Sequence, residues 1–229
     1  IRFIFEDTSR DPTFGANHLL SYLAQDFIES AVSILLLARG GTVSVAKREI
    51  RFIIESSVKV CYVQQESYNS SIERKLMQFD KELSSSRISI KEDLALRMLP
   101  EELRDDFSQE VGRLYGRTSE YVHLTPEQIQ ERIAATDASR ATEAENVVDF
   151  DALNDLLSRG LASSIVLLFH GVSAYVAGDW LVPPDGMMND WYFAASRFIA
   201  GIDSNFDYKA ERQTKLDEIR AARTARIRF

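Results

Sequence analysis

The chain has 229 residues, of which 45% are hydrophobic, so it can bury one large core, and general disorder is excluded. Its formal net charge is −8, which excludes an overall basic field, so any nucleic-acid binding needs a local patch. The single cysteine, Cys61, excludes a disulfide framework and a multi-cysteine metal site, and it favours a reducing, cytoplasmic location.

The first 83 residues have the periodicity of helices, with no convincing set of strands. Apolar side chains recur at helical spacing over residues 17–39, and residues 44–66 are apolar nearly all round a helix. Ser70 and Glu73 have the spacing of a capping box, which predicts a third helix over about 70–83. The opening hexapeptide, IRFIFE, is too short to build a sheet alone.

Prolines mark where the next two helices begin. Pro100 has the character of a first-turn residue and predicts a helix that continues through His123. Thr125 and Pro126 have the cap and first-position pattern of another helix. The small and polar residues at 136–147 then indicate an exposed loop.

A long apolar stretch in the second half raises the question of a membrane span. Residues 160–178, GLASSIVLLFHGVSAYVAG, contain no charged side chain and approach the length of a span. They also contain three serines and His170, and they lack a strong positive flank. We therefore expect a buried central helix over about 150–181 and no membrane association, with a membrane helix as the alternative.

Two further helices, at about 187–200 and 206–226, are expected to close the chain. The predicted fold class is all-α: a bundle of long antiparallel helices over 1–182, and a helical C-terminal extension over 183–229 that packs on the bundle or projects from it. The last eleven residues contain no acid, and they indicate either a solvated helix end or a grip on an acidic partner or RNA. Their four arginines are Arg220, Arg223, Arg226 and Arg228.

Arg51 and Glu55 form the first polar grouping of interest. They lie one turn apart on the most apolar helix, in REIRFIIESSVKVCYV, and share a face with Ile54, Val58 and Tyr62. Charges on such a face are partly buried and must be paired to be tolerated. Two interpretations follow: an internal ion pair that fixes the helix, or an anchor that positions another polar residue at a site.

The second grouping is LYGRTSEYVH, residues 114–123, in which Arg117 precedes His123 by six positions. On a straight helix these two side chains are about 120° apart with roughly 9 Å of rise, so they cannot easily meet at one phosphate. A bend near Gly116 or a second protomer would be needed. Ser119 and His123 border the apolar face, and a histidine at a helix C-terminus is also favoured by the helix dipole without any catalysis.

The RxxxE pattern on an apolar helix, followed by the LYxxTSxxVH segment, resembles bacterial helical proteins of the HEPN superfamily. The resemblance in pattern covers roughly residues 17–180. Members are helical bundles, commonly dimeric, and many are metal-independent endoribonucleases with an Arg-x(4–6)-His motif, in toxin–antitoxin and phage-defence systems. Arg117 and His123 match that motif, with five residues between them.

The resemblance implies a chemistry for these residues. His123 would act as the general base for an RNA 2′-hydroxyl or as the general acid for the leaving oxygen. Arg117 would stabilise the charge on the phosphoryl oxygens. A homodimer would bring two motifs together. The supporting residues, which would orient the catalytic pair, are Ser119, Glu120, Arg51 and Glu55.

No cofactor or metal is expected, because the chain has no glycine-rich phosphate loop, nucleophile elbow, HExxH pattern or cysteine zinc pattern. The expected partners are a second copy of the chain, RNA, or an antitoxin-type protein. The alternative function is a non-catalytic helical interaction or sensor module, in which Arg51, Glu55 and His123 form a structural polar network.

Overall fold

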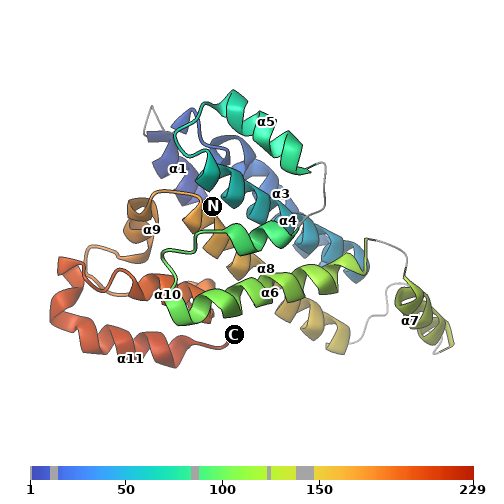
Figure 1. The fold of residues 1–229 in the computed structure, drawn as a ribbon. Coiled ribbons are helices and arrows are strands. Elements are labelled where there is room, and N and C mark those ends of the chain that lie inside the picture. The colour runs from blue at the N-terminus through green and yellow to red at the C-terminus, as the bar shows by residue number, and fades with distance from the viewer. Residues whose placement is uncertain (1, 11–14, 84–87, 123–124, 138–146) are drawn as a thin grey trace.

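The computed structural model describes residues 2–10, 15–83, 88–122, 125–137 and 147–229. Within these residues the chain is helical and contains no β-strand (Figure 1). The predicted all-α class is therefore confirmed.

The described α-helices cross in a bundle, and α7 is set off to one side of it (Figure 1). In chain order they are α1 (Arg2–Arg10), α3 (Leu20–Arg39), α4 (Val43–Glu66), α5 (Ile72–Leu83), α6 (Glu101–Ser119), α7 (Pro126–Asp137), α8 (Val147–His170), α9 (Ala174–Leu181), α10 (Arg197–Ser204) and α11 (Leu216–Arg226). Three short 3-10 helices also occur: η1 (Ile88–Asp93), η2 (Tyr192–Ala195) and η3 (Ala210–Lys215).

Helices α4 and α8 pack against each other at the centre of the bundle. Ile50 and Ile54 of α4 are buried, and Gly160 of α8 lies against both. A Cβ atom at Gly160 would be only 2.9 Å from Cγ2 of Ile50, so the glycine permits this close approach. Helices α3 and α6 also contact α4, which explains why its sequence is apolar nearly all round.

The helix predicted over 100–123 ends earlier, at Ser119, and it runs without interruption through Gly116. The hydroxyl of Thr118 donates to the carbonyl of Leu114 at 2.8 Å, and that of Ser119 donates to the carbonyl of Tyr115 at 2.6 Å. Such bonds to the preceding turn weaken a helix end. The chain then turns through Tyr121, and the bend considered near Gly116 is not observed.

The helix predicted over about 150–181 is divided in two, because α8 ends at His170 and α9 begins at Ala174. The Nε2–H of His18 donates to the carbonyl of Gly171 at 2.7 Å, and this bond replaces the one that the carbonyl would accept in a continuing helix. Ser173 is extended, with φ −62° and ψ 143°. A tertiary contact from a residue 153 positions away therefore ends the helix.

In the described part of the chain, two helices are long and apolar enough to cross a membrane by length and composition, α3 and residues 149–170 of α8. The apolar window of α8 is 61% buried inside the protein, which agrees with the expected buried core helix. The window of α3 is 22% buried, and it leaves Val32, Leu35 and Leu36 exposed.

Aromatic packing explains two other departures from the predicted elements. Residues 2–6 of the opening hexapeptide belong to helix α1, and the ring of Phe3 packs on Trp180 with centroids 4.8 Å apart. The helix expected over 187–200 is replaced by an extended residue at Trp191, then by η2 and α10. The ring of Trp191 packs edge-on against Trp180 at 5.8 Å and Phe193 at 5.6 Å, which holds the backbone away from helical geometry.

The C-terminal extension packs on the bundle, because α10 contacts both α6 and α8. Arg212 is fully buried, and its Nη2 donates to Oδ1 of Asp203 at 2.6 Å and to the carbonyl of Leu181 at 3.2 Å. Arg223 donates to Oδ2 of Asp203 at 2.8 Å and to Oδ1 of Asp207 at 2.5 Å. The interpretation of this segment as a solvated cationic end or a partner-binding grip is therefore wrong for Arg223, whose charge is used inside the fold.

Candidate anion-binding cleft

A cleft of about 330 Å³ lies where the middle of α4 meets the turn that follows α6. The lining side chains come from one face of α4 and from Val122. They are Arg48, Arg51, Phe52, Glu55, Ser56, Lys59 and Val122. Most of the wall is therefore a stripe along α4, because residues three and four positions apart lie on the same side of a helix.

Arg51 connects the two helices at this cleft. Its guanidinium lies over the ring of Tyr115 on α6, 4.8 Å from the centroid, and its Nη2 donates to the hydroxyl of Tyr115 at 2.8 Å. The same Nη2 is 3.6 Å from Oε2 of Glu55. The other terminal nitrogen, Nη1, is buried and has no hydrogen-bond partner among the residues that the structure describes. Because a buried donor without a partner is costly, Arg51 has unused capacity to bind an acceptor.

Glu55 is shared between two buried cations. Its Oε1 accepts a hydrogen bond from Nζ of Lys59 at 2.6 Å, and its Oε2 faces Arg51. The side chain of Lys59 is only 4% exposed and that of Arg51 is 11% exposed. Two cations on one carboxylate leave a surplus of positive charge in a partly dry environment. The predicted Arg51–Glu55 ion pair is therefore present, with Lys59 as a third member.

The turn after α6 is held by two more cations of α4. Nζ of Lys47 donates to the hydroxyl of Tyr121 at 2.7 Å and lies 4.0 Å from the centre of its ring. Nε of Arg48 donates to the carbonyl of Tyr121 at 2.5 Å. These contacts place Val122 at the mouth of the cleft and keep Arg48 beside Arg51 on the wall.

The charge of the lining is opposite to that of the whole chain. Arg48, Arg51 and Lys59 oppose Glu55 alone, so the lining carries 3 − 1 = +2 charges. The chain as a whole carries −8. A positive cleft attracts anions locally even in a protein whose net charge is negative.

Arg117 points away from this cleft. Its Nη1 is 3.7 Å from Oδ2 of Asp155 on α8, and its side chain is 51% exposed. Arg117 and Tyr115 lie on opposite sides of an ideal helix, so their side chains point in different directions. Within the described residues of one chain, Arg117 does not line the cleft that contains Arg51 and Glu55.

The other predicted site residues near the end of α6 have different outcomes. The hydroxyl of Ser119 donates to the helix backbone at Tyr115, and Glu120 is exposed beyond the last helical residue. His123 lies outside the described residues, and it follows Val122 directly in the chain. The structure thus brings together Arg51 and Glu55 of the predicted set, and it places Arg117 elsewhere.

Several lining residues were missed by the sequence reasoning. Arg48 and Lys59 share the helical stripe of Arg51 and Glu55, at spacings of three and four residues, so that stripe was the available signal. The sequence pattern predicts Phe52 as an apolar residue of a core helix, yet it is 46% exposed at the cleft. The packing of α3, α6 and α8 against α4 determines which part of α4 stays exposed, and the sequence alone does not show it.

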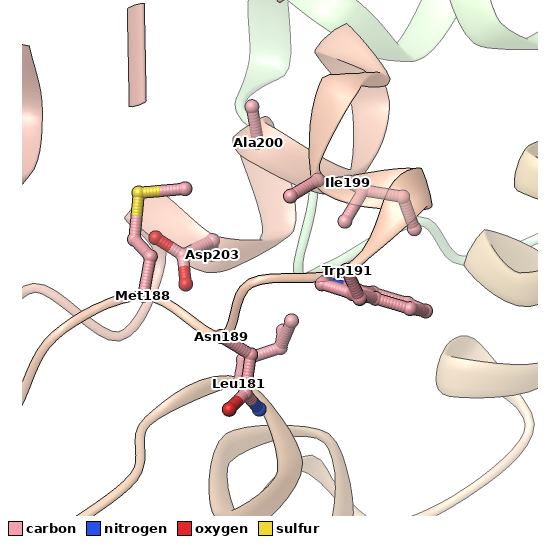
Figure 2. A pocket seen from close by; sticks show the side chains of 8 residues that line it. Leu181, Met188, Asn189, Trp191, Ile199, Ala200 and Asp203 are labelled. Carbon is pink, nitrogen blue, oxygen red and sulfur yellow. The ribbon is translucent and has the colours of Figure 1, made fainter. Parts of the chain in front are cut away.

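A second cavity lies beneath the C-terminal extension, among Leu181, Trp191, Ile199 and Asp203 (Figure 2). Its volume of about 10 Å³ is the space that one water molecule needs, so it cannot hold a substrate. Among the described residues, no group of three or more His, Cys, Asp and Glu side chains could hold a metal ion.

The described histidines, His18 and His170, and the single cysteine, Cys61, are buried and do not line the cleft. Burial lowers the pKa of His18 and of His170 to about 4, so both are neutral near pH 7. Nε2 of His170 accepts from the backbone N–H of Met98 at 3.1 Å, and its Nδ1 donates to the carbonyl of Val166 at 2.8 Å. Burial raises the pKa of the Cys61 thiol well above its usual range, which makes it unreactive.

Comparisons with protein-family models, with curated proteins and with solved structures found no match for this chain. A functional assignment therefore rests on the geometry of the cleft.

Proposed function

We propose that the protein is a metal-independent endoribonuclease of HEPN type that binds an RNA phosphate in the cleft between α4 and the turn after α6. The observation that carries the proposal is the buried guanidinium of Arg51, which lines a positive cleft and has a terminal nitrogen without a hydrogen-bond partner among the described residues. A planar guanidinium is well suited to the oxygens of a phosphodiester.

The proposed reaction needs one base, one acid and stabilisation of charge. The RNA 2′-oxygen attacks phosphorus and gives its proton to a base, the bond from phosphorus to the 5′-oxygen breaks, and that oxygen takes a proton. The products are a 2′,3′-cyclic phosphate and a 5′-hydroxyl. His123, which the resemblance names, would transfer the proton. Arg51 and Arg48 would stabilise the phosphoryl oxygens in the cleft.

Arg117 has a separate place in this proposal. Its distance from the cleft in one chain means that it could reach a bound phosphate only from a second copy, as the predicted homodimer would allow. The proposal places Arg48 and Arg51, and not Arg117, at the phosphate. It also includes a homodimer, a cytoplasmic location and a role in toxin–antitoxin or phage-defence systems. The molar mass in solution, from light scattering, tests the dimer directly.

The second candidate function is a non-catalytic interaction or sensor module. The specific observation in its favour is the closed contact set of Arg51, Glu55, Lys59 and Tyr115, which joins α4 to α6 by itself. Such a network fixes helix register without any ligand. This candidate predicts a folded protein that does not cleave RNA, and in which substitutions in the cleft change only the stability.

RNA cleavage by the purified protein in EDTA tests the proposal, with the His123→Ala, Arg51→Lys and Arg117→Ala variants in parallel. Removal of a proton-transfer group lowers the rate by about 10²–10⁴-fold, and loss of a preorganised guanidinium lowers it by about 10²–10³-fold. We expect the first loss for His123→Ala and the second for Arg51→Lys. For Arg117→Ala we expect the rate to change by less than about tenfold.

The other outcomes of this experiment are equally informative. A folded wild-type protein without cleavage would overturn the nuclease and favour the module. A rate lost in Arg117→Ala and kept in Arg51→Lys would overturn the arginine assignment and place Arg117 at the phosphate, across a dimer. Lys59→Gln tests whether cleavage depends on the positive charge of the whole cleft or on Arg51 alone. The control is Arg113→Ala, because Arg113 is an exposed arginine on α6 that pairs with Glu110.

A further inference from the structure

We infer that the cleft takes a single-stranded RNA segment, with one phosphate on Arg48 and Arg51 and the adjoining base stacked on Phe52. This inference rests on the proposed function, because it names the form of RNA that the same site binds. It goes further in assigning a binding role to an aromatic residue and in excluding duplex RNA.

The composition of the wall supports this inference. Phe52 stands between the cations of the α4 stripe, one residue after Arg51, and it lines the cleft with 46% of its surface exposed. Val122, at the mouth, is 43% exposed. An exposed phenylalanine on a helix that otherwise supplies the core has a cost in water, and a base that stacks on it removes that cost. Arginine beside an aromatic ring is the usual pair for unpaired nucleotides.

The size and charge of the cleft define how much RNA it holds. A volume of about 330 Å³ is at the lower end of the range for small-molecule sites, which suits one nucleotide. The surplus of two positive charges neutralises about two phosphates, while the chain as a whole repels a polyanion. A base in a duplex is stacked and paired, so its face cannot reach Phe52.

The binding experiment uses the full chain and a fluorescent twelve-nucleotide RNA in which every 2′-oxygen is methylated. Such an RNA cannot be cleaved through its 2′-hydroxyl, so affinity is measured apart from catalysis. The same sequence annealed to its complement serves as the duplex probe. Inorganic pyrophosphate, as a competitor, reports on the phosphate subsite alone.

We expect Phe52→Ala to weaken binding of the single strand by about 5–100-fold, the range of one base–aromatic stack, and to leave competition by pyrophosphate unchanged. Phe52→Trp retains the affinity, and Phe52→Leu loses it although the side chain stays apolar. Arg48→Ala weakens the single strand and pyrophosphate alike, and it reduces the slope of log affinity against log salt by about 0.7. Tyr175→Ala, at an exposed tyrosine of α9, is the matched control and changes nothing.

Equal affinity for the duplex and the single strand would overturn the inference, and so would a Phe52→Ala variant that binds like the wild type. Phe52 is half exposed, so its alanine variant should fold, and its melting temperature verifies this. The failure of the nuclease is a separate result. If binding depends on Phe52 but unmodified RNA is not cleaved, this inference holds and the nuclease proposal fails. If RNA is cleaved at the same rate with and without Phe52, the inference fails and the nuclease proposal holds.

Discussion

The guanidinium of Arg51 lies over the ring of Tyr115 and bonds its hydroxyl at 2.8 Å. The two residues come from the two polar groupings that stand out in the sequence, the RxxxE helix and the LYxxTSxxVH segment. Their contact makes one site of two patterns that are 64 residues apart. The properties of that site depend on the one carboxylate within it.

Glu55→Gln should destabilise the fold and strengthen anion binding at the same time. The buried Lys59 and Arg51 lose their shared counter-charge, which costs about 3 kcal/mol in the free energy of unfolding. The lining becomes one charge more positive, and this tightens pyrophosphate binding by about fivefold. Urea titration and calorimetry measure the two effects. Weaker anion binding would contradict the assignment, and Glu66→Gln, exposed at the end of α4, is the control.

Asp203→Asn should be among the most destabilising isosteric substitutions in the chain. It leaves the buried Arg212 and Arg223 with Asp207 as their remaining carboxylate among the described contacts, at a cost of about 3–5 kcal/mol. Urea unfolding gives the value. Asp190→Asn is the matched control, because Asp190 is 95% exposed and 3.7 Å from Arg226, and it should change stability by less than about 0.5 kcal/mol.

Stability should fall as the pH is lowered from about 6.5 towards 4. The folded pKa of His18 and of His170 is about 4 because both are buried, while the unfolded chain binds these protons near pH 6.5. The unfolded state therefore gains protons first, and each histidine lowers the free energy of unfolding by about 2 kcal/mol between neutral pH and pH 5. Urea titrations at pH 7, 6 and 5 measure this slope, and His170→Gln should reduce it by about half. A flat profile would show that these imidazoles remain accessible to protons.

Two glycine-to-alanine substitutions should have opposite signs. At Gly160 a Cβ atom would press against Ile50 at 2.9 Å, and separating α8 from α4 costs about 1–3 kcal/mol. At Gly116 nothing lies within 4 Å of a Cβ, so alanine should stabilise α6 by about 0.5–1 kcal/mol. Thermal unfolding of both variants checks the pair. A destabilised Gly116→Ala would show that this position needs glycine for another reason.

The helical periodicity of the sequence predicted α3, α4, α5 and the start of α6 well, because these helices have an apolar face or a recognisable first turn. It failed at the divided helix, since the contact between His18 and Gly171 joins residues 153 positions apart. The prediction for Arg223 is wrong for a related reason. Residues 219–229 contain no acidic side chain, but Arg223 donates hydrogen bonds to Asp203 and Asp207, which lie 20 and 16 positions earlier in the chain.

The candidate site was predictable in part. The Arg51–Glu55 pair follows from helical geometry, because both residues lie on one face of the same helix. The role of Phe52 does not follow from it, since its exposure depends on how the neighbouring helices cover α4.

The close packing of the last 47 residues means that the two predicted parts of the chain are one folding unit. The carbonyl of Phe229 accepts the N–H of Arg197 at 2.8 Å, the N–H of Arg228 donates to Ala195 at 2.8 Å, and Phe198 packs on Phe107 of α6 with ring centroids 5.0 Å apart. A fragment that stops at residue 182 would therefore expose the apolar side of α6 to water, and we expect it to aggregate. Unfolding of the intact chain should follow a single transition, in which the helix that supplies Tyr115 to the cleft is lost together with the C-terminal segment that supports it.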